Sequence, residues 1–189
     1  MRSEEANQTM HVSKRQRLDI YVEELAGTTA LNADILAQYR AGRDAADVRR
    51  SHWFGGRFEN IYLGVERVPA LAPVLKLARE GARRFLGRPD VSLVTGFWFN
   101  DMGPGQRTLM HDHDEDKELV SAVYYVDVPP DSGELVLYQG LTKTVVSPRA
   151  GCLVYFRPDL PHEVTENRSG SSRLSVGMNF LRSGDAVDE

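Results

Sequence analysis

Six consecutive residues, His111 to Asp116 (HDHDED), place two imidazoles and four carboxylates immediately before a strand-like segment. A charge run without histidine usually marks a solvated loop, whereas imidazoles among carboxylates can bind a metal. His162 begins a second strand-like segment farther along the chain. Alternate residues of a strand face the same side, so His111 and His113 can point inward while Asp112 points away. With His162 they would hold a divalent metal and leave one face open for a co-substrate and oxygen.

Arg173 and Ser175 lie two positions apart in the strand-like segment that follows His162. Alternation places both side chains on one side of the strand, where a guanidinium and a hydroxyl can share one carboxylate. An arginine inside a water-poor barrel forms a much stronger pair with a carboxylate than an exposed one does. This spacing predicts a site for an anionic co-substrate beside the metal.

Two helical segments precede these residues. In TTALNADILAQYRAG the apolar residues Leu31 and Ile35 recur at helical spacing, and Gly42 is expected to end the helix. In VPALAPVLKLAREGARRFLG, Pro73 fits the first turn of a helix and Gly87 its end. The glycine-containing connection SHWFGGRFEN is expected to serve in packing or as a lid rather than in the chemistry.

After Pro89 the chain consists of short β-branched and aromatic runs, separated by turns at 129–133 and 147–151. Helices followed by antiparallel strands predict an α+β domain whose helices cover one face of a sandwich or jelly roll. We expect a disordered leader at 1–17 and one domain at 18–189, with helical support at 28–87 and a β core at 91–181. The predicted strands are VSLVTGFWFN, LVSAVYYVDV, ELVLYQ, KTVVS, GCLVYF, HEVTE and RLSVGMNFL.

Composition excludes several classes of function. The net charge of −4 and the pI near 5.8 provide no basic surface for a nucleic acid, so none is expected as a partner. No apolar run predicts a membrane span or a signal peptide, and we expect a cytoplasmic protein without a membrane partner. The single cysteine, Cys152, excludes an internal disulfide and a zinc site made of several thiolates, and we expect it to be buried.

Residues 91–181 resemble the catalytic core of the Fe(II)/2-oxoglutarate-dependent oxygenases, particularly the prolyl-hydroxylase-like and bacterial branches. The motifs follow the family's order: a glycine, a variant of His-x-Asp, a tyrosine-rich strand, a Gly-Glu-Leu turn, the strand PRAGCLVYF, a distal histidine and then a basic residue. The resemblance implies a double-stranded β-helix, the cupin-like jelly roll, with the N-terminal helices packed on one sheet.

The same resemblance implies an activity. Fe(II), 2-oxoglutarate and O2 would serve as cofactor and co-substrates, and an unidentified small-molecule or peptidyl substrate would be hydroxylated with release of succinate and CO2. His111 would be the proximal iron ligand and His162 the distal one. Arg173, assisted by Ser175, would pair with the distal carboxylate of 2-oxoglutarate.

Three further residues are assigned to the co-substrate pocket by the resemblance. Tyr124 and Tyr125 match the strand from which the family directs a tyrosine hydroxyl at 2-oxoglutarate. Tyr125 is preferred, although a bulge in the strand would exchange the two. Asn100 is expected to line the pocket from the strand that precedes the histidines.

One position departs from the family pattern. The family carries a carboxylate two residues after the first histidine, where this chain has His113. His113 can bind and give a site of three histidines, or Asp112 or Asp114 can replace it, or the register can slide so that His113 pairs with Glu115. We choose His111, His113 and His162, a set with one negative charge fewer, which is expected to bind ferrous iron less tightly.

Two other functions fit parts of the same pattern. A cupin-type metal-dependent dioxygenase or isomerase would use the three histidines without 2-oxoglutarate, but Arg173 and Ser175 argue against it. A non-catalytic jelly-roll binding module would use HDHDED for calcium or for nothing. For the substrate side of the pocket the candidates are Phe97, Trp98, Phe99 and Tyr138, with ordinary core packing as the preferred interpretation.

Overall fold

The computed structural model describes residues 20–113 and 117–184. The expected leader at 1–17 and the alternative ligands Asp114 and Glu115 lie outside the described residues. The helices are α1 (Thr29–Gly42) and α2 (Ala72–Leu86), preceded by a short 3-10 helix, η1 (Pro69–Leu71). The strands are β1 (Ile20–Glu24), β2 (Arg49–Phe54), β3 (Arg57–Tyr62), β4 (Leu93–Met102), β5 (Thr108–His111), β6 (Glu118–Asp127), β7 (Leu135–Gln139), β8 (Thr142–Val146), β9 (Cys152–Phe156), β10 (His162–Val164) and β11 (Arg173–Arg182).

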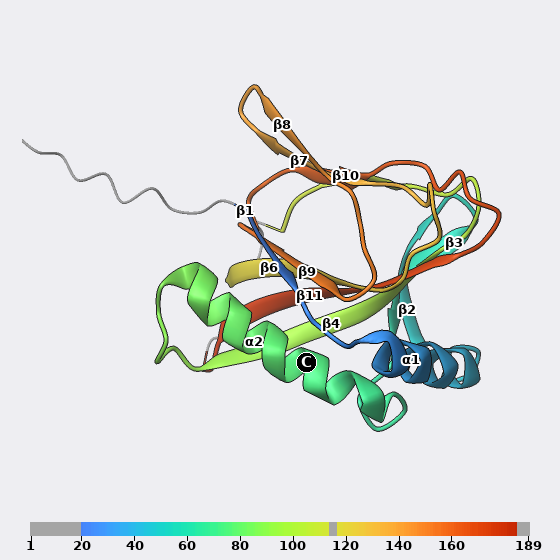
Figure 1. Ribbon diagram of the computed structural model, residues 1–189, viewed down its shortest axis with the longest axis horizontal. Helices are drawn as coiled ribbons and strands as arrows, with labels where there is room; N and C mark the ends of the chain where they lie inside the picture. Colours follow the sequence, from blue (N-terminus) through green and yellow to red (C-terminus); the bar gives the residue numbers. More distant parts are fainter. Residues whose placement is uncertain (1–19, 114–116, 185–189) are drawn as a thin grey trace, which may run out of the picture.

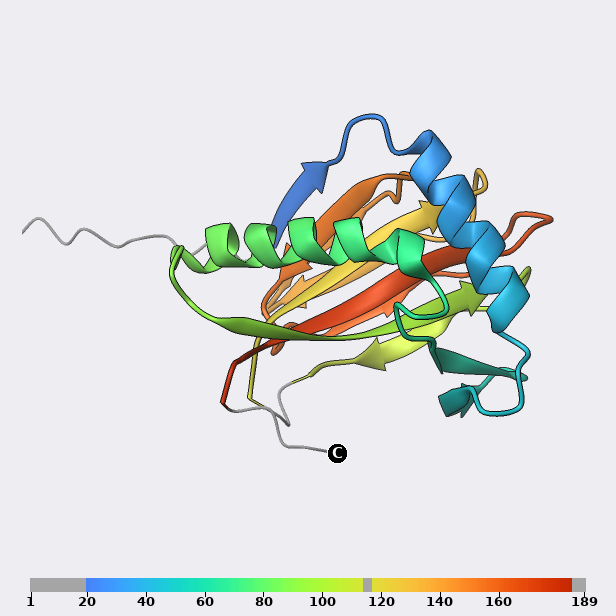
Figure 2. The same ribbon diagram turned by 90° about the horizontal axis from the view of Figure 1, so that it is seen from below.

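Two antiparallel sheets face each other. The larger has seven strands in the order β1-β9-β6-β11-β4-β3-β2, and the smaller has four in the order β5-β10-β7-β8. Figures 1 and 2 show both helices on the outer face of the larger sheet, with the smaller sheet on the opposite side. The predicted α+β jelly roll with helices packed on one sheet is confirmed.

Helix α2 packs closely on the larger sheet because its inner face is made of small and branched side chains. Val74, Leu75 and Ala78 are buried there. A Cβ atom at Gly81 would lie 2.0 Å from the hydroxyl of Tyr155, so this glycine permits the close approach of helix and sheet. The helix ends at Gly87, whose φ of 64° is readily adopted only by glycine, as its sequence position predicted.

Strands β1, β2, β3 and β5 were not predicted. The segment that we expected to be a connection forms the hairpin of β2 and β3, with the turn at Gly55 and Gly56. Strand β2 lies at one edge of the larger sheet and β5 at one edge of the smaller. Edge strands bury few side chains on either face, so they lack the apolar alternation by which strands are predicted.

The centre of the larger sheet is β11, which pairs along its length with β4 and β6. Arg173, Ser175 and Gly177 alternate along it on the side that faces the smaller sheet. Ser175 lies between Asn100 of β4 and Tyr125 of β6 in this register. Pairing with β4 on one side and β6 on the other therefore fixes the positions of these residues, on which the predicted co-substrate site depends.

Two apolar clusters stabilise the fold. The larger lies between the helices and the seven-stranded sheet and includes Ile35, Phe99 and Val176. The smaller lies between the two sheets and includes Leu160 and Cys152, which is buried as expected. None of the described helices has the length and apolarity needed to cross a membrane.

Candidate functional site

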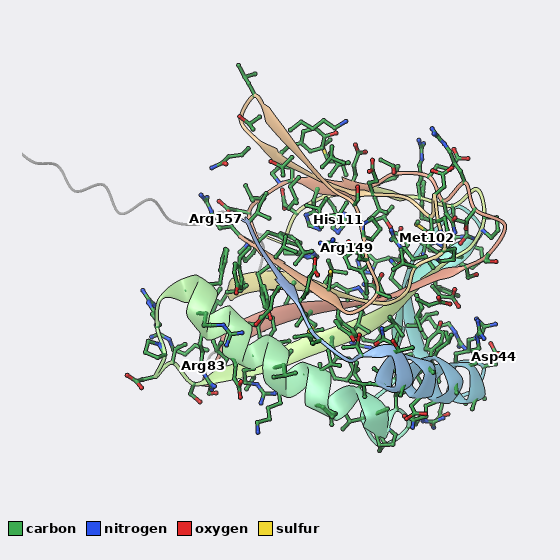
Figure 3. The ribbon with its side chains drawn as sticks, viewed as in Figure 1. Asp44, Arg83, Met102, His111, Arg149 and Arg157 are labelled. Carbon is green, nitrogen blue, oxygen red and sulfur yellow. The ribbon has the colours of Figure 1, made fainter. Side chains whose placement is uncertain are left out.

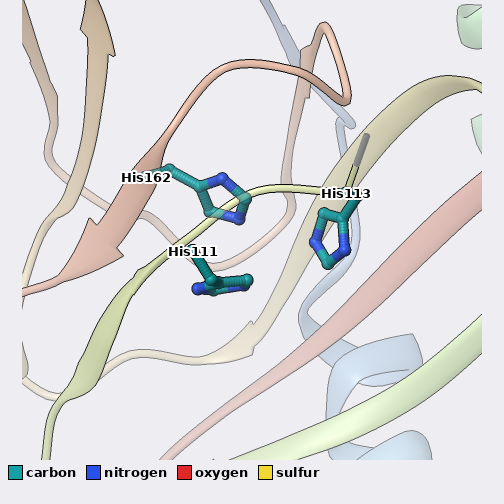
Figure 4. Close-up of side chains that lie close together, drawn as sticks. All are labelled: His111, His113 and His162. Carbon is teal, nitrogen blue, oxygen red and sulfur yellow. The ribbon is translucent and has the colours of Figure 1, made fainter. Parts of the chain in front are cut away.

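Three imidazoles meet at one point between the sheets. His111 ends β5 and His162 begins β10, and these two residues are direct partners in the smaller sheet. His113 follows β5 by two residues. Their potential ligand atoms all lie within 4.8 Å of one another, and the rings of His111 and His162 are 4.2 Å apart between centroids. Figure 4 shows the three rings converging from two segments of the chain.

Two of the three rings are oriented by the backbone. Nδ1 of His111 lies 2.8 Å from the carbonyl oxygen of Leu109, and Nδ1 of His162 lies 2.9 Å from that of Leu160. A carbonyl oxygen only accepts hydrogen bonds, so Nδ1 carries a hydrogen in each ring, and in the neutral form of the ring Nε2 has the free lone pair. This arrangement is typical of histidines that bind a metal through Nε2.

Burial keeps two of the imidazoles in the neutral form that binds metals. It lowers the pKa of His162 to about 3 and that of His113 to about 4, and the neighbouring His111 lowers both further. The carboxylate of Asp112, one of the alternative ligands, also lines the cavity but does not belong to the group of described donor atoms that lie within 4.8 Å of one another.

The imidazoles open into a cavity of about 560 Å³ between the two sheets, and Arg173 and Tyr125 also line it. In Figure 3, His111 and Met102 lie in the region between the sheets, whereas Asp44 and Arg83 lie on the helical side of the molecule. Residues from β4, β5, β6, β10 and β11 therefore line one cavity.

Arg173 is buried in this cavity with 2% of its surface exposed. Nη1 donates to the carbonyl oxygen of Gly133 at 3.2 Å, and Nη2 lies 3.9 Å from the sulfur of Met102. Among the described residues, Nε has no acceptor and no carboxylate pairs with this guanidinium. Burial also lowers the pKa of Arg173. A buried cation without a fixed counter-charge favours an anionic ligand.

Two side chains beside Arg173 are suited to the same ligand. Ser175 is buried and lines the cavity. The guanidinium of Arg173 lies 5.7 Å from the ring centroid of Tyr125. Burial raises the pKa of Tyr125 to about 12, so its hydroxyl remains a neutral hydrogen-bond donor at physiological pH.

The expectation that Tyr124 contributes to the pocket is wrong. Its hydroxyl donates to the amide oxygen of Asn32 on α1 at 2.6 Å, on the helical side of the larger sheet. Neighbouring residues of a strand face opposite sides, so Tyr125 enters the cavity and Tyr124 does not. Asn100 lines the cavity as expected, and its amide oxygen accepts a hydrogen bond from Nη1 of Arg57 at 3.3 Å.

Of the four aromatic candidates for the substrate side, Trp98 lines the cavity. Phe99 is fully buried on the helical side, where its ring lies 4.9 Å from that of Tyr39, and Phe97 packs against the same cluster. The hydroxyl of Tyr138 donates to Glu163 at 2.6 Å. Core packing was the correct interpretation for Phe97 and Phe99.

Sequence reasoning missed two residues of the β2–β3 hairpin. Arg57 is 8% exposed and links three strands, since it donates to Glu59 of β3 at 3.2 Å, to Asn100 of β4, and to Thr108 of β5 at 3.3 Å. His52 lines the cavity with a φ of 59°, which is rare for a residue other than glycine. The aromatic residues beside two glycines were the one available signal for this hairpin.

Comparisons with known proteins agree with this geometry. Residues 97–181 match the family profile of the 2OG-Fe(II) oxygenase superfamily. A crystal structure of a prolyl-4-hydroxylase from Pseudomonas putida is 24% identical, with a TM-score of 0.63 over 87% of this chain and 92% of that chain. A prolyl hydroxylase from Trichoplax adhaerens, solved with a peptide of the hypoxia inducible factor, is 15% identical, with a TM-score of 0.69 over 88% and 85%.

A carbocyclase of nogalamycin biosynthesis that depends on alpha-ketoglutarate is 16% identical, with a TM-score of 0.66 over 88% of this chain and 80% of that chain. No curated protein matches the sequence. The structural likenesses establish a shared fold, and the profile match covers the strands that carry the histidines and Arg173. The matched segment is less than half of the chain, and it is similar to the 2OG-Fe(II) oxygenase superfamily, whose members use Fe(II), 2-oxoglutarate and O2.

Proposed function

We propose that this protein is a 2-oxoglutarate-dependent dioxygenase, a hydroxylase in which His111, His113 and His162 hold the iron and Arg173 holds the distal carboxylate of 2-oxoglutarate. One observation carries the proposal. Three imidazoles that converge within 4.8 Å share a cavity with a buried guanidinium that no described carboxylate neutralises. A divalent metal fits the first group and a dicarboxylate fits the space between the two.

The donor atoms suit ferrous iron. Imidazole nitrogen is a common ligand of iron, and two of the rings already direct Nε2 away from the backbone carbonyls that hold Nδ1. A site of three neutral ligands leaves the charge of the metal uncompensated. An anionic co-substrate would then contribute more to charge balance than it does at a site that contains a carboxylate.

Bound Fe(II), 2-oxoglutarate and O2 would supply the oxidative chemistry: 2-oxoglutarate loses CO2 and takes one oxygen atom of O2 to become succinate, and the other oxygen atom enters a C–H bond of the substrate. The chain supplies orientation and exclusion of water. Arg173 and Ser175 hold one end of the co-substrate, and the neutral hydroxyl of Tyr125 is placed to donate to the same group. The amide group of Asn100 has its oxygen engaged by Arg57, which leaves its NH2 group to donate into the cavity.

The substrate that we propose is a small molecule or an exposed residue of a peptide. Both kinds are represented among the similar proteins, since one was solved with a peptide and another acts in nogalamycin biosynthesis. The cavity also has room beyond the metal, toward Trp98 of β4 and the hairpin residues His52 and Asn60.

The proposal is tested by anaerobic titration of the Fe(II)-loaded protein with 2-oxoglutarate. Chelation of iron by the keto acid should produce a weak visible charge-transfer band, and admission of air should release succinate. The His162→Ala variant should lose both the iron and the band, whereas His52→Ala should keep them because His52 lies outside the cluster. A wild-type protein that binds iron but gives neither band nor succinate would instead be a cupin-type enzyme without 2-oxoglutarate.

A further inference from the structure

The three imidazoles are not held in the same way. His111 and His162 each bond a backbone carbonyl through Nδ1, whereas the ring of His113 has no hydrogen bond to any other described residue. Its backbone is fixed, since the N–H of His113 donates to the carbonyl oxygen of Pro158 at 2.9 Å. Among the described residues, only packing contacts are therefore available to restrict the torsions of this side chain.

The ring of His113 lies 5.1 Å from that of His111 and 5.2 Å from that of His162, between centroids, and its aromatic neighbour outside the histidine cluster is Trp98. The ring centroids of His113 and Trp98 are 5.9 Å apart with an interplanar angle of 57°, and both residues line the cavity. Trp98 is on β4 in the middle of the larger sheet, a position fixed by its pairing with β11. Because the indole is attached to an inner strand, it can restrict the movement of the His113 ring, which lies two residues beyond the edge strand β5.

The position of the Trp98 indole depends on the space left by a glycine in the neighbouring strand. Its partner in the neighbouring strand is Gly177, and a Cβ atom there would lie 2.5 to 2.7 Å from three atoms of the indole. Real Cβ atoms do not approach other atoms so closely, so any side chain at this position would displace the indole. The φ of Gly177 is not positive, and the requirement for glycine is one of space.

We propose that Trp98, packed against Gly177, is a positioning residue that holds His113 in the orientation for binding the metal. The inference rests on the proposed role of His113 as the third ligand. The family pattern has a carboxylate at this position, which is short and needs no such support. An imidazole is longer and has more rotational freedom, and the indole compensates by occupying the space into which it would otherwise turn.

The first test compares two glycines of the same sheet. In the register of β4 and β11, Gly177 pairs with Trp98 and Gly96 pairs with Asn179. A Cβ atom at Gly96 has no neighbour within 4 Å, so Gly96→Ala is a matched control for Gly177→Ala. Titration of the metal-free protein with Co(II), followed by its visible d–d absorption, should show affinity reduced ~10-fold or more for Gly177→Ala, with a changed spectrum, and nearly unchanged for Gly96→Ala.

The second test shows whether Gly177 acts through the indole. Trp98→Leu should also weaken Co(II) binding, and adding Gly177→Ala to it should have little further effect, because residues that act through one contact are not additive. Trp98→Phe retains an aromatic ring and should recover most of the affinity. Thermal unfolding of each metal-free variant separates altered metal binding from a failure to fold.

A third measurement locates the metal. The sequence has two tryptophans, and Trp53→Phe leaves Trp98 as the single one. Co(II) should quench the fluorescence of this folded variant with the stoichiometry of metal binding. Trp53 is 63% exposed and has no place in the proposed site, so the replacement should leave metal affinity unchanged.

The outcomes distinguish this inference from the proposed function. If Co(II) binds the wild type and His162→Ala equally, or binds neither, the metal centre itself is wrong. If binding requires His162 but Trp98→Leu and Gly177→Ala keep the affinity and spectrum of the wild type, the metal centre stands and the role of Trp98 is disproved. Stoichiometric binding to Trp53→Phe without quenching, or equal weakening by Gly177→Ala with and without Trp98, would also disprove that role.

Discussion

The floor of the cavity and its mouth are built from different parts of the larger sheet. The floor is the inner face of β11, whose residues Arg173, Ser175 and Gly177 lie between two strands that pair with it along its length. The mouth includes the β2–β3 hairpin at the edge of the sheet, from which His52 and Asn60 line the cavity. Trp53 and Phe58 of the same hairpin lie outside the cavity and are 63% and 37% exposed. Groups on the floor cannot shift without disturbing two ladders of hydrogen bonds.

This difference separates two requirements. The metal and co-substrate sites need fixed geometry, and the centre of a sheet supplies it. The surface that meets the substrate can vary, and an edge hairpin held by a few side-chain contacts tolerates change. Arg57 connects the two regions, because it belongs to the hairpin and donates a hydrogen bond to Asn100 of β4, which pairs with Ser175 of the floor. Four measurements test the comparison, beginning with the largest expected effect.

Truncation of an aromatic residue should have unequal effects on stability in the inner strands of the larger sheet and in the edge hairpin. Phe99 on β4 is fully buried, so Phe99→Ala should lower the free energy of unfolding by about 3 to 5 kcal/mol. Phe58→Ala in the hairpin should cost less than about 1 kcal/mol, because the side chain is already partly in water. Chemical denaturation measures both values. Equal costs would mean that the hairpin is as much a part of the core as the inner strands are.

The two buried arginines should contribute differently to co-substrate binding. Arg173→Met leaves the distal carboxylate of 2-oxoglutarate without a cation and should weaken its binding by roughly 2 to 4 kcal/mol at unchanged iron affinity. Arg57→Met removes a guanidinium that already has Glu59 as its partner, and the loss should be about tenfold or less, acting through Asn100. Titration of the charge-transfer band gives both numbers. A larger loss for Arg57→Met would place the carboxylate site at the hairpin.

Buried imidazoles of the site should make the metal-free protein sensitive to acid. The pKa values of His162 and His113 in the folded state are about 3 and about 4, below the ordinary value of about 6.5 in an unfolded chain. As the pH falls below about 6.5, the unfolded state binds protons first, so stability is complete above this pH and declines toward the folded pKa values. Each imidazole contributes a slope of about 1.4 kcal/mol per pH unit in this window.

Denaturation of the metal-free protein at several pH values measures this slope. His162→Asn should reduce it by about one proton, since the folded state then excludes one proton fewer relative to the unfolded state. Phe58→Ala, which changes no titratable group, should keep the slope of the wild type. An unchanged slope in His162→Asn would mean that this imidazole is not buried in its neutral form.

The smallest effect is expected at His52, whose φ of 59° is unfavourable for any residue with a Cβ atom. His52→Gly should raise stability by about 1 kcal/mol or less, although it removes an imidazole that contacts Ser51 and Asn60. Ser51→Gly, one residue away in the same strand, should instead lower stability. Thermal unfolding midpoints that move in opposite directions would support strain at His52, and a fall in both would refute it.

Much of the fold could be predicted from the sequence because its central elements have strong local signals. The apolar periodicity and the glycines at positions 42 and 87 predicted both helices, and the strands from β6 to β9 have the β-branched and aromatic residues of a buried sheet. The four strands that were missed, β1, β2, β3 and β5, include both edges of the larger sheet and one edge of the smaller. Their pairing is decided by contacts with distant segments, and the local sequence of a short polar strand does not indicate such contacts.

For the site, the sequence determined the residue types and the alternation of the strands, which predicted His111, His113 and His162 as one group. Alternation alone did not decide between Tyr124 and Tyr125, because a bulge would exchange them. Tertiary structure alone decided that the hairpin supplies Arg57 and His52 to the cavity and that Trp98 lies on Gly177 against His113. These contacts join residues far apart in the chain. A local pattern specifies the side of the strand on which a side chain lies. Only the packing of one strand against another specifies which residues that side chain contacts.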